Sequence, residues 1–185
     1  IDTKHYPTYD DLEKRLRGPN LVMPTEMIHG IYDGGGGAGL EDYWNAIARS
    51  PYGAGAFLWV FADEGIQRTD QDGRIDVFST FAPDGLVGPH HEKEGSFYTV
   101  RDLYSPVQIT APLLDEHFAG TVAVQNRYDF TSLAQCRVTW KLLRYRGPVE
   151  KETAPIVLSE GSVTPPAVAP HASGQLTLGL PANWR

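Results

Sequence analysis

The sequence has 185 residues, enough for one large domain or two small ones. Apolar residues make up 41% of it and charged residues 21%, a composition that favours a packed core over disorder. The net charge of −7 repels phosphate backbones and anionic lipid, and no run reaches the roughly 18 apolar residues of a membrane helix. We therefore expect neither nucleic acid nor a membrane as a partner, and the single cysteine, Cys136, excludes an internal disulfide.

The two halves of the sequence differ in charge. Residues 1–107 carry 17 acidic and 9 basic side chains, whereas residues 108–185 carry 6 and 7. The start of the sequence lacks the layout of a signal peptide. Because the sequence begins with Ile1 rather than Met and its last residues, GLPANWR, stop without a terminal signal, we expect a piece of a longer protein. Periplasmic, secreted and cytoplasmic locations are all compatible with it.

Helical and apolar segments alternate in the first half, which is typical of a parallel α/β layer. Thr8, with Asp11 three residues later, predicts the start of the first helix. Three helices are predicted, over residues 9–17, 40–49 and 97–103. The apolar runs predict strands at 21–23 and 54–62, with a further strand around His5; the second run has no polar residue, so we expect it to be covered on both faces.

Apolar residues alternate with polar ones in the second half, and turn clusters separate the segments. This pattern predicts strands over residues 120–127, 136–144, 156–158 and 175–180. Strands at such spacing indicate a small β-sandwich. The Pro-rich stretch Thr164 to Pro170 is interpreted as a rigid connection, and Cys136 as a small buried apolar residue within its strand.

Two glycine-containing segments resemble ligand-binding loops. Gly34 to Gly39 satisfies the G-x-G-x-x-G pattern of dinucleotide-binding loops, but ten residues separate it from the preceding strand, and Asp33 would face the phosphates. Asp70 to Gly73 resembles a calcium loop, but its glycine falls at the fourth position instead of the sixth. We interpret the first as a flexible or tightly turned loop and the second as a hairpin-type turn.

His90, His91 and Glu92 are candidate metal ligands. Adjacent side chains on an extended loop point apart, and no third ligand follows at a regular spacing. The sequence therefore predicts no metal site here.

Glu26 is the most informative carboxylate, because it follows the apolar run 21–23 and so stands where parallel α/β folds place functional groups. His29 follows it by three residues, and Trp59 lies toward the end of the next apolar run. A carboxylate beside an aromatic surface suits cleavage of glycosidic bonds, whose transition state has oxocarbenium character. A salt-bridge partner or a helix cap is the alternative interpretation of such an acid.

The residues just described resemble glycoside hydrolase family 2, the family of the large bacterial β-galactosidases. The blocks that carry the resemblance are, in chain order, 25–29 (TEMIH), 40–44 (LEDYW), 54–59 (AGAFLW), 83–87 (PDGLV), 97–107 (FYTVRDLYSPV), 128–131 (YDFT) and 138–140 (VTW). The resemblance implies an α/β plus all-β chain: residues 1–106 as the C-terminal portion of a (β/α)8 barrel, and 107–185 as an immunoglobulin-like β-sandwich.

The same resemblance assigns site residues. Glu26 matches the nucleophile, His29 and Trp59 match residues that line the sugar pocket, and Phe81 and Asp84 match residues at the pocket rim. The sequence departs from the family's galactosidases in having Met27 where an aromatic residue is common and Asp84 where Asn is common. The resemblance therefore leaves the identity of the sugar open.

The resemblance implies a retaining exo-β-glycosidase that works through a covalent glycosyl-enzyme, with a carbohydrate substrate and no cofactor. The family's acid/base is a Glu preceded by Asn, and no Asn-Glu pair occurs in these 185 residues. We therefore expect the remaining barrel strands of the parent protein to supply it, and this segment alone to be inactive. A homo-oligomer and a bound cation are both compatible with the sequence.

Two other functions are kept open. One is a non-catalytic carbohydrate-binding or structural module in which the sandwich carries the role and the α/β part is a scaffold. The other is a nucleotide-binding domain built on the glycine loop, which predicts that Gly36→Ala abolishes nucleotide affinity.

Overall fold

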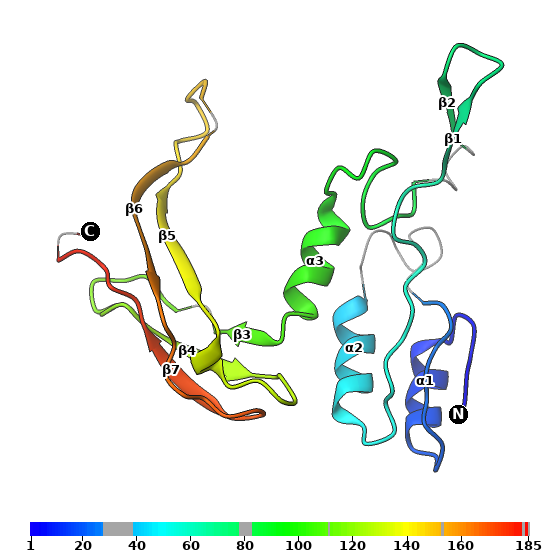
Figure 1. Ribbon diagram of the computed structural model, residues 1–185, viewed down its shortest axis with the longest axis horizontal. Helices are drawn as coiled ribbons and strands as arrows, with labels where there is room; N and C mark the ends of the chain where they lie inside the picture. Colours follow the sequence, from blue (N-terminus) through cyan, green and yellow to red (C-terminus); the bar gives the residue numbers. More distant parts are fainter. Residues whose placement is uncertain (28–38, 78–82, 111, 153, 183, 185) are drawn as a thin grey trace. The chain divides into compact units, whose positions relative to one another are not determined.

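The structure is a computed structural model that describes the chain except for residues 28–38, 78–82, 111, 153, 183 and 185 (Figure 1). The chain divides into two compact units, residues 1–104 and 105–185. The first unit combines helices with extended segments, and the second contains almost only strands, so the predicted α/β plus all-β composition is confirmed. No helix among the described residues has the length and hydropathy needed to cross a bilayer.

The three helices of the first unit lie where the sequence predicts them. They are α1 (Tyr9–Leu16), α2 (Leu40–Arg49) and α3 (Gly95–Leu103). The Thr8 hydroxyl accepts a hydrogen bond from the Asp11 amide (3.3 Å), as the predicted cap requires. Gly39, with a φ of +80°, precedes α2, and the rest of the glycine loop before it lies outside the described residues. In Figure 1, α1 and α2 lie side by side.

Three extended segments of the first unit, at residues 2–5, 22–27 and 53–58, run parallel with the middle one between the other two. The pairs that join them are Asp2 with Val22, His5 with Glu26, Val22 with Gly53, and Met27 with Leu58. The predicted strands at 21–23 and 54–62 do pair in parallel, but only through separate bridges rather than a regular ladder, and the second segment is paired only as far as Leu58 and again at Ala62. Pro24, fully buried in the middle segment, has no N–H to donate and interrupts the ladder.

Apolar residues from α1, α2 and the middle segment form the core of the first unit: Leu12, Leu16, Val22, Met27, Leu40 and Ile47. The expectation that residues 54–62 are covered on both faces is wrong. Phe57 and Phe61 are 58% and 61% exposed, because no described element covers the outer side of this segment.

A hairpin follows the third segment. Its strands are β1 (Gly65–Arg68) and β2 (Arg74–Val77), paired antiparallel. Asp72 and Gly73 adopt positive φ angles of 51° and 78°, which is the backbone that tight hairpin turns require. The interpretation of Asp70 to Gly73 as a hairpin-type turn is therefore confirmed.

The second unit has two antiparallel sheets. One has the order β3 (Val107–Ile109), β4 (Thr121–Asn126), β7 (Ser173–Thr177), and the other pairs β5 (Val138–Arg144) with β6 (Ile156–Val163). The four predicted strands correspond to β4 to β7, although β6 extends five residues beyond the predicted end because its polar residues mask the alternation. A short 3-10 helix, η1 (Leu133–Gln135), precedes β5.

The core of the second unit is apolar with one buried amide. Its buried apolar residues are Val122, Val124, Leu133, Val168 and Leu176. Asn126 is fully buried, and its side-chain amide donates to the carbonyl oxygens of Thr131 (2.9 Å) and Val168 (3.0 Å). Because Val168 belongs to the Pro-rich stretch, this amide fastens the connection between β6 and β7 to β4. Cys136 lies just before β5 and is half-buried against this core, so its predicted place within the strand and its full burial are both corrected.

Candidate active site

Glu26 lies where the three parallel segments end, between its two neighbours. On one side the Tyr6 amide donates to the Glu26 carbonyl oxygen (3.0 Å). On the other side, the backbone of Met27, the residue after Glu26, makes two hydrogen bonds. Its amide donates to the Phe57 carbonyl oxygen (2.9 Å), and its carbonyl oxygen accepts from the Trp59 amide (3.2 Å). Parallel segments present their C-terminal ends at one edge, so His5, Glu26 and Trp59 are brought to the same edge of the unit.

The carboxylate of Glu26 contacts an imidazole that the sequence interpretation did not include in the site. His5 Nε2 lies 3.3 Å from Glu26 Oε2, and the Glu26 side chain is 26% exposed, against 61% for His5. The His5 ring in turn meets the Tyr6 ring edge-on, with centroids 4.7 Å apart. The sequence did contain a signal for this contact, namely the strand expected around His5. If that strand pairs in parallel with the segment of Glu26, its last residues lie beside the Glu26 carboxylate.

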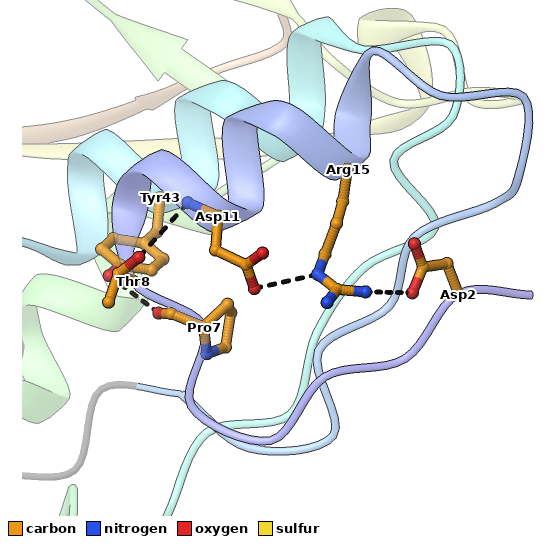
Figure 2. Close-up of polar contacts among 6 residues, drawn as sticks. All are labelled: Asp2, Pro7, Thr8, Asp11, Arg15 and Tyr43. Carbon is orange, nitrogen blue, oxygen red and sulfur yellow. Dashed lines mark hydrogen bonds and ion pairs between the residues drawn. The ribbon is translucent and has the colours of Figure 1, made fainter.

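Contacts around α1 hold the segment that carries His5 at both of its ends (Figure 2). Arg15 on α1 donates to the carboxylates of Asp2 and Asp11, the latter at 2.9 Å. At the other end, the Tyr43 hydroxyl on α2 donates to the Pro7 carbonyl oxygen (3.0 Å). The hydrogen bond to Asp11 is the main cause that raises the pKa of Arg15, and Asp2 adds to it. Two helices therefore fix the position of the first segment.

Trp59 and Asp84, two residues that the resemblance assigns to the sugar pocket, are in direct contact. The indole Nε1 of Trp59 donates to Asp84 Oδ2 at 3.1 Å. Asp84 is buried, with 6% of its surface exposed, and Trp59 is half-buried. Because the buried carboxylate accepts this hydrogen bond, it fixes the orientation of the indole. One aromatic ring is thereby held at the edge of the unit where Glu26 lies.

The backbone next to Asp84 is packed too tightly for a side chain. The Gly85 amide donates to Asp63 Oδ1 (2.8 Å), and a Cβ on Gly85 would lie 2.3 Å from the Asp63 nitrogen. The Gly85 carbonyl oxygen accepts from the hydroxyl of Ser96 at the start of α3 (3.2 Å). The glycine thus allows the close approach that places Asp84 within hydrogen-bonding distance of the Trp59 indole N–H.

Acidic side chains gather around this turn. Desolvation raises the pKa of the Glu94 carboxyl, and the nearby charges of Asp63 and Glu92 shift it in the same direction. Of the two adjacent histidines, the His90 backbone amide donates to Glu92 Oε2 (2.8 Å), and the His91 ring packs edge-on against Phe61. The described part of the chain contains no group of three or more His, Cys, Asp or Glu side chains arranged to hold a metal ion.

Two predicted site residues, His29 and Phe81, lie outside the described residues. Of the remaining three, Trp59 and Asp84 are hydrogen-bonded to each other, and Glu26 is joined to Trp59 through the Met27 backbone. The arrangement provides a partly exposed carboxylate, an imidazole beside it and an oriented indole. This set can act as a nucleophile or ion-pair partner and can support the apolar face of a ring.

The second unit matches a known family of protein domains. Residues 122–184 match the family described as "Beta-galactosidase, domain 4". The match lies entirely within the unit formed by residues 105–185, where the structure shows the two antiparallel sheets.

The chain is also similar to a part of several β-galactosidases. It is 27% identical over 165 residues to a β-galactosidase of Actinobacillus pleuropneumoniae, an alignment that covers 85% of this chain and 15% of that protein. It is 28% identical over 153 residues to one from Priestia megaterium and over 160 residues to one from Aeromonas hydrophila, in each case over 77% of this chain.

The similarity to distant β-galactosidases is confirmed by these comparisons, and it includes part of the first unit as well as the second. The chain spans about 15% of the length of these relatives. The roles of Glu26, His29, Trp59, Phe81 and Asp84 are not tested by the comparisons and stay predictions.

Proposed function

We propose that this chain is a segment of a retaining exo-β-glycosidase of the β-galactosidase type and that Glu26 is its nucleophile. The observation that carries the proposal is the position of the Glu26 carboxylate, at the C-terminal end of the middle one of three parallel segments, with His5 and Trp59 delivered to the same edge. Catalytic groups of barrels occupy such ends. The similarity to β-galactosidases over most of the chain supports this assignment.

The domain assignment is part of the proposal. Residues 1–106 form the C-terminal portion of a (β/α)8 barrel, and residues 107–185 form an immunoglobulin-like sandwich. The order of segment, helix, segment, helix and segment in the first part supports the barrel, since each helix connects two parallel neighbours. Two antiparallel sheets around one apolar core support the sandwich.

In the proposed mechanism, a Glu26 oxygen attacks the anomeric carbon while the bond from that carbon to the leaving oxygen breaks. A second carboxyl group protonates the leaving oxygen and later removes a proton from the water that hydrolyses the glycosyl ester. His29 hydrogen-bonds a sugar hydroxyl, Trp59 packs against the apolar face of the ring, and Phe81 forms the rim, whereas Asp84 is too buried to line it. Asp84 acts by orienting the Trp59 indole.

The second carboxyl group comes from outside this sequence. A full barrel needs about 250 residues, and the chain spans only about 15% of its β-galactosidase relatives. The partners of this segment are therefore the remaining barrel strands of its parent protein and a carbohydrate. The 185 residues alone are inactive in this proposal.

The experiment is to place Glu26→Gln in the full-length parent protein and to assay a panel of aryl β-glycosides. Gln keeps the shape of the side chain but cannot form the glycosyl ester, so we expect turnover to fall about a thousandfold or more. Glu41→Gln, an exposed carboxylate on α2, is the control and should keep the activity of the parent. A 2-fluoro glycoside should label Glu26; unchanged activity, or a label on another residue, contradicts the assignment.

A second candidate function is a non-catalytic module, and it is favoured by one observation: the family match is confined to residues 122–184 and does not include Glu26. The same glycoside panel distinguishes the two functions. A full-length parent that binds sugar without turnover, and that Glu26→Gln leaves unchanged, supports the module.

A further inference from the structure

The contact between His5 and Glu26 contributes little to the stability of the first unit. His5 Nε2 lies 3.3 Å from Glu26 Oε2, but the His5 side chain is 61% exposed, and exposed ion pairs add little to the free energy of unfolding. The unit draws its stability from its buried apolar core, which neither of these side chains joins. We therefore ask what the contact does to the carboxylate itself.

The backbone holds His5 and Glu26 in register. The two residues form a parallel bridge, and residues paired in this way point to the same side of their segments. On either side of the bridge, the Tyr6 amide donates to the Glu26 carbonyl oxygen and the Thr25 amide donates to the Lys4 carbonyl oxygen, each at 3.0 Å. Contacts from α1 and α2 hold both ends of the His5 segment (Figure 2). The imidazole is thus carried on a fixed backbone.

The residue after His5 restrains the imidazole ring. The Tyr6 ring meets it edge-on, with an angle of 73° between the ring planes. Tyr6 has a φ of +47°, so the extended conformation ends directly after His5. His5 is therefore the last bridged residue of its segment, with Tyr6 against its ring and Glu26 beside Nε2.

The two oxygens of the Glu26 carboxylate are equivalent unless a neighbour distinguishes them. The last side-chain torsion of glutamate is broad and two-fold, so the carboxylate by itself has no fixed plane. Histidine Nε2 is a donor in the imidazolium and also in the neutral tautomer that carries its proton on this nitrogen. A donor at Nε2 distinguishes Oε2 from Oε1 and restrains the rotation of the carboxylate.

We propose that His5 is a positioning residue of the candidate active site, which holds Oε2 of Glu26 and leaves Oε1 to attack the anomeric carbon. This inference rests on the proposed function, in which Glu26 is the nucleophile. As Oε1 bonds to the anomeric carbon, the bond from that carbon to the leaving oxygen breaks, and the second carboxyl group gives that oxygen its proton. Oε2 becomes the carbonyl oxygen of the glycosyl ester and keeps its contact with His5.

The test measures how fast a 2-fluoro glycoside labels Glu26 in the full-length parent protein and in three variants of it. His5→Leu removes the donor, and His5→Gln keeps an N–H group that can reach the same oxygen. Lys4→Leu is the matched control, because Lys4 is exposed on the same segment and its side chain points to the opposite side.

A reacting group displaced by about 1 Å costs up to about a hundredfold in rate. We therefore expect His5→Leu to lower the first-order labelling constant about 10- to 100-fold and to leave the inhibition constant of the glycoside unchanged. His5→Gln should recover most of this loss, and Lys4→Leu should be labelled at the rate of the unsubstituted protein.

Four outcomes overturn the inference. If His5→Leu is labelled as fast as Lys4→Leu, His5 does not position the carboxylate, although a label on Glu26 still supports the proposed function. A weaker inhibition constant with an unchanged labelling constant shows that His5 binds the sugar instead. Equal losses in His5→Leu and His5→Gln show that the donor plays no part. Absence of a label on Glu26 in the unsubstituted protein overturns the proposed function and this inference together.

Discussion

Glu26 and His5 are 21 positions apart, and their contact depends on the pairing of two segments rather than on any local pattern. A single isolated carboxylate at a strand end is more often a salt-bridge partner than a catalyst, and the imidazole at 3.3 Å shows that Glu26 does have an ionisable neighbour. The Glu26 carboxylate can therefore be interpreted either as a nucleophile or as the salt-bridge partner of His5. Labelling with a fluorosugar separates them, because only a nucleophile forms the covalent bond.

Replacement of Trp59 by Phe should destabilise the first unit. Phe keeps an aromatic ring but loses the N–H that donates to the buried Asp84 carboxylate, so we expect the free energy of unfolding to fall by about 1–3 kcal/mol. Urea denaturation followed by circular dichroism measures the change. Asp84→Asn retains an oxygen acceptor for the indole and should cost less. Equal stability of Trp59→Phe and the parent would show that this hydrogen bond contributes nothing.

Turns and connections, rather than regular strands, position the site elements of the first unit. Arg15 on α1 and Tyr43 on α2 hold the ends of the first segment, and the close approach of Gly85 to Asp63 places Asp84 beside the indole N–H of Trp59. These contacts join elements that are distant in sequence. If a substitution removes any of these contacts, we expect a site residue to change its position although its own side chain is unaltered.

Gly85→Ala should be strongly destabilising, while Gly95→Ala should be neutral or stabilising. A Cβ at position 85 would lie 2.3 Å from the Asp63 nitrogen and 2.7 Å from the Val87 carbonyl oxygen, both backbone atoms that cannot rotate away, so we expect a cost of about 1–3 kcal/mol or more. At the first residue of α3 a Cβ meets nothing within 4 Å, and Ala should add about 0.4–1 kcal/mol. Thermal unfolding of both variants measures this; similar effects would contradict the packing at Gly85.

The tip of the β5–β6 hairpin should loosen in acid. The Glu150 carboxylate accepts hydrogen bonds from the Gly147 amide and from the Arg146 side chain. Both hydrogen bonds, that of Gly147 more than that of Arg146, lower the pKa of Glu150 from the ordinary value of 4.5. A lowered folded-state pKa means that the stabilisation is present above 4.5 and is lost as the pH falls through the folded-state value. Amide NMR signals of residues 146–150 should therefore shift and broaden in acid, and Glu150→Gln should show the acid form at neutral pH. Signals that do not respond to acid would contradict this.

At the scale of the whole molecule, the chain has two separate apolar cores, one built by α1, α2 and the middle segment and the other enclosed by two sheets. Large apolar side chains outside these cores are exposed in both units. Phe57 and Phe61 are exposed in the first unit, and Ile109 on β3 is exposed in the second. Each unit therefore presents large apolar side chains to solvent.

Leu12→Ala and Leu133→Ala should destabilise different units. Both leucines are fully buried, each in its own core, so each substitution should cost about 2–5 kcal/mol of the free energy of unfolding of its own unit. Calorimetry of the chain should show that Leu12→Ala shifts one transition and Leu133→Ala the other. A single transition shifted equally by both would show that the two units unfold together.

Elements with local signals were predictable from the sequence. The Thr8 cap and the apolar face of residues 40–49 gave α1 and α2 their positions, and alternation gave β4 and β5, because such signals arise within one turn or one strand. The short strands β1, β2 and β3 were missed, as was the full length of β6. Three or four residues contain too few alternations to be distinguished from loop.

The sequence by itself determined the two chemical halves of this chain, its helices, the hairpin turn at Asp72 and Gly73, and the carboxylate and indole on which the proposed chemistry depends. Only the tertiary structure decided that His5 meets Glu26, that Asp84 orients Trp59, and that β5 pairs with β6 alone among the described strands. The physical reason is that periodicity and capping act over a few residues, whereas these contacts join segments that become neighbours only when the chain folds.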